Sequence, residues 1–216
     1  MNTKILNITN GNCFNSYFLS RFGGEAIPFR EAMMDGDAAP DIYSEEFIAL
    51  RSSSLEVSTE EYKSDMLVCH ALSENDYGRL DLWFGKDTFC QLNLLTLLAY
   101  LEQIRYSGRV FLNYIDDETC AVLESDIEVE LGSYKKLYED ILILKRVPDD
   151  VKILVPEAIA LYFDYHSDNG ALAKTVRANS NLEHLELVCL LIVGSKAYGL
   201  SDEQAEKLIK KYKYTE

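Results

Sequence analysis

Polar residues follow each of four apolar runs in the first part of the chain, and their types suit the binding of an anion. They are Asn10, Gly11 and Asn12 after residues 4–9, Arg30 and Glu31 at the end of residues 25–30, Lys86 and Asp87 after residues 79–84, and Asp116 and Asp117 after residues 109–115. A guanidinium such as that of Arg30 grips a phosphate or carboxylate through two parallel hydrogen bonds, which lysine does not match. Backbone N–H groups between a strand and a helix, as at residues 10–12, cradle an anion. The sequence thus predicts a site for a small anionic ligand, such as a nucleotide or a phosphorylated metabolite.

Asp87 stands directly before a long apolar run, where it is placed to cap the N-terminus of a helix. Gln91, four residues later, lies on the same helical face. A capping carboxylate keeps a second oxygen for a ligand, so capping and binding are compatible. The predicted ligand-binding residues are Asn10, Gly11, Asn12, Arg30, Lys86 and Gln91, and the candidate catalytic carboxylates are Asp87 and Glu31.

The chemistry of such a site stays open between binding alone and metal-assisted hydrolysis or transfer. Asp87, Glu31 and Asp116 would suit Mg²⁺, which prefers carboxylates and water. Arg30 could instead pair with Asp87 or Glu31 and tie two loops together. No P-loop, nucleophile elbow or kinase signature occurs, and the three histidines lack zinc-ligand spacing, so the sequence names no cofactor and assigns no metal ligand.

The elements that position these residues follow from hydrophobic periodicity and turn signals. Strands are predicted at residues 4–9, 25–30, 79–84, 109–115 and 127–131, and helices at 13–22, 44–51, 58–72 and 88–105. Pro28 lacks an N–H group, so its strand should be short or lie where one ladder bond is dispensable. This alternation predicts an α/β fold with a mostly parallel, Rossmann-like sheet and flanking helices. Helical patterns alone follow, including 181–196 and 202–213, so we expect an α/β domain at 1–132 and an all-α domain at 133–216.

Composition limits the partners. Among 216 residues, 36 acidic side chains face 21 basic ones, for a formal net charge of −15. This charge disfavours broad binding to nucleic acids or anionic membranes. The five cysteines are scattered, and the first residues lack a signal-peptide pattern, so we expect a cytoplasmic protein with reduced thiols, as a monomer or an oligomer.

Four sequence pieces resemble a known family: "NGNCFNSYF", "FREAMMDG", "LWFGKDTFCQLNLL" and "GLSDEQAEKLI". The chain is similar over nearly its whole length to the bacterial domain-of-unknown-function family eighteen thirty-five. The resemblance implies an architecture and a set of polar positions, and it lends no activity. Where the family often has Gly-Asp after the first strand, this chain has Gly11 and Asn12, which would remove a base or metal ligand at that point.

Two other functions compete with ligand binding. Helices 181–196 and 202–213, joined by a turn at Tyr198 and Gly199, could form a DNA-binding helix-turn-helix with Lys207, Lys210, Lys211 and Lys213 on the last helix. Acidic residues nearby cancel that charge, which favours an ordinary helical hairpin. Alternatively, the helical part is a pure interaction module.

Overall fold

A computed structural model describes residues 4–73, 77–147 and 156–213 of the chain. These residues fall into two compact units. The first consists of Met1–Lys86 and Cys90–Asp150, and the second of Asp87–Phe89 and Val151–Glu216. The domain boundary between residues 132 and 133 stays a prediction.

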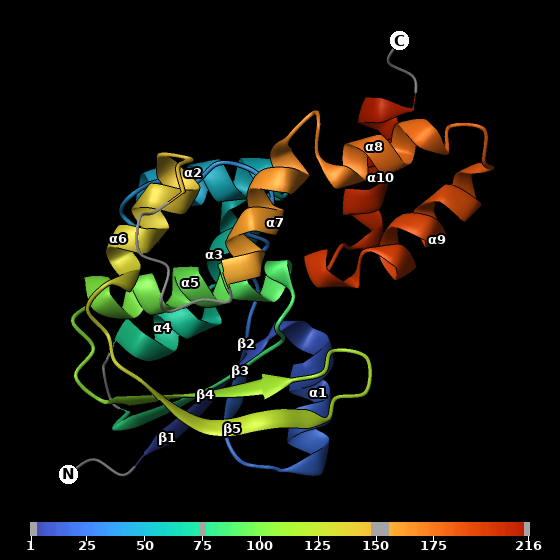
Figure 1. Cartoon of the computed structure of the whole chain (residues 1–216). Helices are drawn as coiled ribbons and strands as arrows, with labels where there is room; N and C mark the ends of the chain where they lie inside the picture. The colour runs from blue at the N-terminus through green and yellow to red at the C-terminus, as the bar shows by residue number, and fades with distance from the viewer. Residues whose placement is uncertain (1–3, 74–76, 148–155, 214–216) are drawn as a thin grey trace. The chain divides into compact units, whose positions relative to one another are not determined.

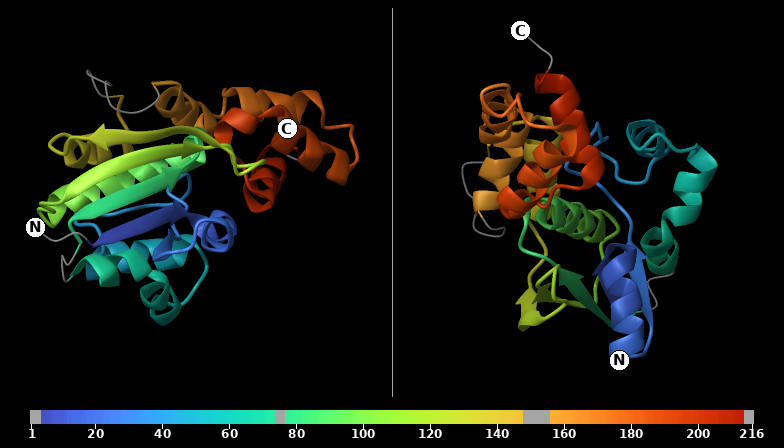
Figure 2. Two further views of the ribbon diagram at one scale, coloured as in Figure 1. Left: turned by 90° about the horizontal axis from the view of Figure 1, so that it is seen from below. Right: turned by 90° about the vertical axis from the view of Figure 1, so that its right-hand side faces the viewer.

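One five-stranded sheet forms the centre of the first unit, within the described residues. Its strands are β1 (Ile5–Asn10), β2 (Ala26–Phe29), β3 (Arg79–Phe84), β4 (Arg109–Ile115) and β5 (Val122–Val129). They lie side by side in the order β2-β1-β3-β4-β5 (Figure 2). β1 to β4 are parallel, and β5 pairs antiparallel with β4. The prediction of an α/β fold with a mostly parallel sheet is therefore confirmed.

The strands at the two edges show how local sequence sets pairing. β2, which contains Pro28, is a four-residue edge strand, as its missing N–H group predicted. β5 begins five residues before the predicted start at residue 127, because residues 116–121 form a tight turn. In this turn the Asp116 carboxylate accepts hydrogen bonds from the backbone N–H of Thr119 at 2.8 Å and from its hydroxyl at 2.7 Å. A hairpin of this kind makes the pairing antiparallel.

Alternation along β3 separates two cores. Trp83 stacks with Phe14 and packs at a tilt against Phe18, both of α1 (Gly11–Arg21). Leu82 and Phe84, on the other face of the strand, are fully buried. The helices α4 (Leu67–Ser73) and α5 (Thr88–Gln103) lie above the strands in the view of Figure 1. α5 is apolar nearly all round, as expected for a helix buried between layers.

The remaining helices of the first unit begin at side-chain caps. Ser44 caps α2 (Glu45–Ser54) through the N–H of Phe47, and Ser58 caps α3 (Thr59–Asp65) through that of Glu61. The helix predicted over 58–72 is interrupted at Met66, which separates α3 from α4. α6 (Tyr134–Tyr138) and the π-helical η1 (Glu139–Ile143) also belong to this unit.

The described part of the second unit contains α7 (Pro156–His166), α8 (Ala171–Ala178), α9 (His184–Gly194), the 3₁₀ turn η2 (Lys196–Tyr198) and α10 (Asp202–Tyr212). Asp164 joins three of these elements, because its carboxylate accepts from the N–H of Ala171 and the hydroxyl of Tyr198. Ser201 and Gln204 form a capping box at the start of α10. None of the helices among the described residues is long and apolar enough to cross a membrane.

Candidate functional site

The strand order reverses direction at β1. The chain passes from β1 to β2 on one side and then returns across β1 to β3 on the other. In open parallel sheets, ligands bind at such a reversal, beyond the carboxyl ends of the strands. Asn10 is the last residue of β1 and therefore lies at this point.

Asn10 is held by α5 rather than used to cap α1. Its Oδ1 accepts a hydrogen bond from Nδ2 of Asn93 at 3.0 Å, and its own Nδ2 contacts Sγ of Cys90 at 2.9 Å. Asn10 occupies the N-cap position of α1 but makes no side-chain hydrogen bond to the described residues of that helix. The first N–H groups of α1 therefore lack the partner that an asparagine at this position usually supplies.

The backbone at the start of α1 is open. Gly11 has φ +75°, and a Cβ atom built there meets none of the described atoms within 4 Å outside its chain neighbours. Positive φ is readily adopted by glycine, and the open space gives a ligand access to the N–H groups that follow. The anion cradle at residues 10–12 stays a prediction, which the conformation and openness of Gly11 favour.

Arg30 lies beside this helix start. Its Nε donates to Oδ1 of Asn12 at 2.8 Å, and its Nη1 forms an ion pair with Asp65 at the end of α3. The Arg30 side chain is 34% exposed. Asp65 is thus the acidic partner of Arg30, whereas Glu31 pairs with another arginine.

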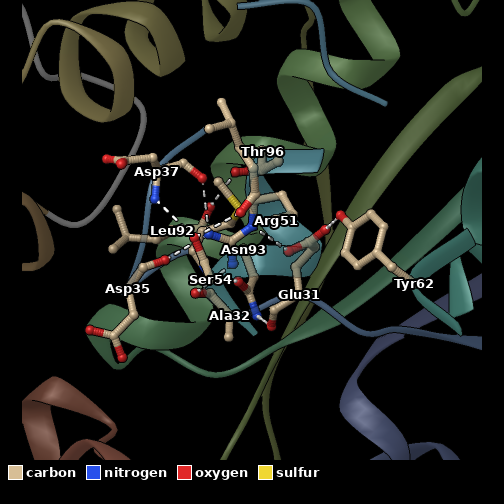
Figure 3. A network of polar contacts seen from close by, with 12 residues as sticks. Glu31, Ala32, Asp35, Asp37, Arg51, Ser54, Tyr62, Leu92, Asn93 and Thr96 are labelled. Atoms are coloured by element: carbon tan, nitrogen blue, oxygen red, sulfur yellow. Dashed lines mark hydrogen bonds and ion pairs between the residues drawn. The ribbon is translucent and has the colours of Figure 1, made fainter. Parts of the chain in front are cut away.

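That other arginine, Arg51 of α2, is fully buried and forms a network with Glu31 (Figure 3). Arg51 Nε donates to Oε2 of Glu31 at 3.2 Å, and the hydroxyl of Tyr62 donates to Oε1 from the other side. Burial raises the pKa of Glu31 above its ordinary value, while Arg51 and Tyr62 partly offset this effect. Both carboxylate oxygens are already engaged, so these contacts make Glu31 an anchor of the loop, and its catalytic role stays a prediction.

The same network fixes the loop that follows β2. Arg51 donates through Nη1 to the carbonyl of Asp35 at 2.7 Å and through Nη2 to that of Ala32 at 3.0 Å. Asn93 donates to the carbonyl of Glu31 at 2.6 Å and accepts from the N–H of Met33 at 3.0 Å. Arg30 directly precedes this loop, so α2 and α5 together determine where its side chain starts.

A small hollow lies between Arg30 and Tyr62. Its cavity volume is about 10 Å³, and it is partly open to solvent. Its lining residues are Pro28, Phe29, Arg30, Glu31, Tyr43, Tyr62, Asp65, Met66 and Val68. A cavity needs about 10–15 Å³ on this measure to hold one water, so the hollow suits no more than a water or a small ion.

The other predicted residues have different surroundings. Lys86 forms an ion pair with Glu124 of β5 and lies 4.8 Å from the ring centroid of Tyr114. Gln91 is fully buried, and its Nε2 donates to the carbonyl of Gly85 at 2.6 Å. Its Oε1 has no hydrogen-bond partner among the described residues.

Asp87 is grouped with the second unit, where it lies against the turn after η2. A Cβ atom added to Gly199 would lie 2.0 Å from Oδ1 of Asp87, and Gly199 has φ +66°. Beside it, the hydroxyl of Thr88 donates to the carbonyl of Ala197 at 2.9 Å. These contacts explain why residues 87–89 belong with the later helices. Metal binding by Asp87, Glu31 and Asp116 stays a prediction, and Glu31 and Asp116 are each held by separate protein partners.

Cysteines and acids neighbour the carboxyl end of β1. The Cys90 Sγ lies 3.7 Å from Oδ2 of Asp117. Burial and the nearby Cys13 and Asp117 raise the pKa of the Cys120 thiol. A raised pKa keeps this thiol protonated near neutral pH, which does not suit a nucleophile.

The structure thus brings together Asn10, Asn12, Arg30 and Glu31, and it adds residues that the sequence analysis did not select. These are Arg51, Tyr62, Asp65, Cys90 and Asn93. Two of them carried a signal, because Asn93 interrupts an apolar run and Arg51 lies on a helix face that is otherwise buried. Their partners are distant in sequence, so the signal named no role.

Comparisons of the chain with protein-family models, with curated proteins and with solved structures found no match. The resemblance to family eighteen thirty-five stays a prediction.

Proposed function

We propose that this protein binds a small anionic ligand, carrying a phosphate or a similar group, at the start of α1 beside Arg30. One observation carries the proposal: an arginine lies at a helix N-terminus whose cap residue is turned away. Asn10 is engaged by Asn93 and Cys90, while Arg30 contacts Asn12 in the first turn of α1. The helix dipole and the N–H groups that the Asn10 side chain does not cap favour an anion at this end.

Each residue has a defined part in this proposal. Gly11 gives access to the backbone, the N–H groups of the first turn donate to the anion, and Arg30 adds a charged fork. Asn12 orients the guanidinium through its Oδ1. The hollow beside Arg30 holds no more than a water or a small ion, so a nucleotide or phosphorylated metabolite would bind outside it, with its anionic group at the start of α1.

The architectural part of the proposal is that the first unit is Rossmann-like and the C-terminal part all-α. The strand order, with β1 at the reversal, supports the first point. The run of described helices from α7 to α10 supports the second. We also propose a cytoplasmic location, on the ground that the five cysteines are scattered. Metal-assisted hydrolysis or transfer by Asp87 or Glu31 is left as a prediction.

The test is a thermal-shift and calorimetric series with inorganic phosphate, nucleotides and sugar phosphates, with and without Mg²⁺. A ligand that binds only the folded chain raises its melting temperature. Replacing Arg30 by alanine should lower the affinity for the best ligand by ten- to a hundredfold, since a hydrogen bond to a charged group contributes about 1.5–3 kcal/mol.

Arg109→Ala is the matched control, because Arg109 is also an exposed arginine paired with an acid. Its affinity should equal that of the natural chain. Equal losses in the two variants, or no binding of any tested anion by a well-folded sample, would contradict the proposal.

DNA binding by the C-terminal helices stays a prediction that one observation opposes. Asp202 and Glu203 are exposed in the first turn of α10. In a helix-turn-helix, the N-terminal residues of the second helix contact base edges, where two carboxylates would meet the phosphate field of DNA. Of the lysines on this helix, Lys211 forms an ion pair with Asp168.

A further inference from the structure

α9 has a second apolar face beyond the one it buries. Leu187, Val188 and Leu191 are buried in the second unit. Leu185 and Val193 are 73% and 66% exposed, and Cys189 between them is also exposed. A helix that is apolar all round is normally covered on both sides. Leu185, Cys189 and Val193, here called the α9 stripe, therefore form a surface suited to a partner.

The α9 stripe is symmetric about its middle. Its residues are four positions apart, so each step turns by only about 40° around the helix and the three side chains lie in one row. Cys189 is at the centre of this row. If two copies of α9 pack antiparallel about a two-fold axis at Cys189, Leu185 of each copy meets Val193 of the other.

Charge selects the antiparallel arrangement. Glu183 and Glu186, which form the capping box of α9, are exposed at its start, and Lys196 is exposed just after its end. Antiparallel packing brings the acidic start of one helix to the lysine end of the other, whereas parallel packing juxtaposes like charges. The stripe itself carries no charge, which matters because two copies with a net charge of −15 repel elsewhere.

We propose that the α9 stripe is the interface of a homodimer in which the α9 helices of two copies pack antiparallel. A membrane surface fits it less well, because helices that lie on anionic membranes carry lysine and arginine along their polar face and α9 begins with glutamates. The contact is small, so the dimer is expected to be weak and dependent on concentration.

The test is sedimentation equilibrium of the full chain over a range of concentrations. The natural chain should show a reversible monomer–dimer equilibrium. Leu185→Glu should shift the dissociation constant by at least tenfold toward monomer, since it sets a carboxylate against an apolar partner. Leu144→Glu changes an exposed leucine that lies in the first unit instead, and it should leave the equilibrium unchanged. Circular dichroism checks that both variants fold, which the exposure of both side chains favours.

A second measurement tests whether the α9 stripe lies at the contact. A short bis-maleimide should link two copies through Cys189, and Cys189→Ser should remove this product, whereas Cys13→Ser should not, although Cys13 is also exposed. A monomer at all concentrations, a dimer that ignores Leu185→Glu, or cross-linking that does not depend on Cys189 would each overturn the proposal.

Discussion

The parallel strands carry arginines both at their amino ends and at their carboxyl ends, and the two sets have contrasting surroundings. At the amino ends of β3 and β4, Arg79 and Arg109 stack over the ring of Phe111 at 4.0 and 4.7 Å from its centroid. Arg79 pairs with Asp81 and Asp126, and Arg109 pairs through two nitrogens with Glu128. At the carboxyl ends, Arg30 has one acidic partner and lies beside the start of a helix.

An arginine by itself therefore does not mark an anion site. The guanidinium groups of Arg79 and Arg109 are engaged by acids and an aromatic ring, so they leave little positive potential for a ligand. Arg30 adds its charge to the positive end of α1. The buried Arg51 holds the loop behind it, and among the described residues no buried arginine lies at the amino ends. Four predictions test these differences, in order of expected effect.

Arg51→Met should produce the largest change. It leaves the buried Glu31 without its cationic partner, and breaking a buried pair in this way costs about 3–5 kcal/mol. The free energy of unfolding, measured in urea, should fall by this amount. Arg109→Met breaks an exposed pair at the amino end of β4 and should change the free energy of unfolding far less. Similar urea midpoints for the two variants would show that the arginines at the two ends of the strands do not differ in their contribution to stability.

Glu31→Gln should change the dependence of stability on pH. Burial raises the pKa of Glu31 in the folded protein above its ordinary 4.5, so folding favours its protonated form. The stability from this preference is complete below pH 4.5 and is lost as pH rises through the folded pKa. The natural chain should therefore lose stability relative to Glu31→Gln as pH rises from 4.5 through the folded pKa of Glu31. A difference in unfolding free energy that stays constant over this range would contradict the assignment.

Gly11→Ala should lower the free energy of unfolding by about 1–2 kcal/mol, because its φ of +75° strains any residue with a Cβ. Space is not the cause, since the built Cβ meets none of the described atoms within 4 Å. Gly11→Asn is the control, since asparagine tolerates this backbone conformation better, and it should restore part of the loss. Equal stability of all three chains in thermal unfolding would refute the strain.

Asp65→Asn should have the smallest effect, and this effect should be a gain in ligand affinity rather than a loss of stability. It removes the acid paired with Arg30, so the affinity for an anion should rise about two- to fivefold, in line with the value of an exposed ion pair. Asp126→Asn removes an acidic partner of Arg79 at the amino end of β3 and should leave the affinity unchanged. Calorimetry with the best ligand measures both. A rise in affinity for Asp126→Asn alone would place the anion at the amino ends of the strands and contradict the proposal.

Local chemistry accounts for most of what could be predicted from the sequence. Hydrophobic periodicity located the four parallel strands and α5, and Pro28 indicated a short strand. The caps at Ser44, Ser58 and Ser201 are local too, because each serine accepts a hydrogen bond from an N–H group three residues away. The polar ends of β1 and β2 could be selected as one candidate site, since parallel strands end at the same edge.

Long-range contacts decided the rest. The sequence made Asn10 and Asp87 look alike, as polar residues before a helix, yet Asn10 reaches Asn93 and Asp87 belongs with residues near Gly199. Arg30 selects Asp65, and Glu31 selects Arg51, over gaps of 35 and 20 residues. Periodicity and capping depend on neighbours within one or two turns, so the sequence by itself determined the elements and their polar ends. Which side chain meets which depends on how those elements pack, and only the tertiary structure decided that.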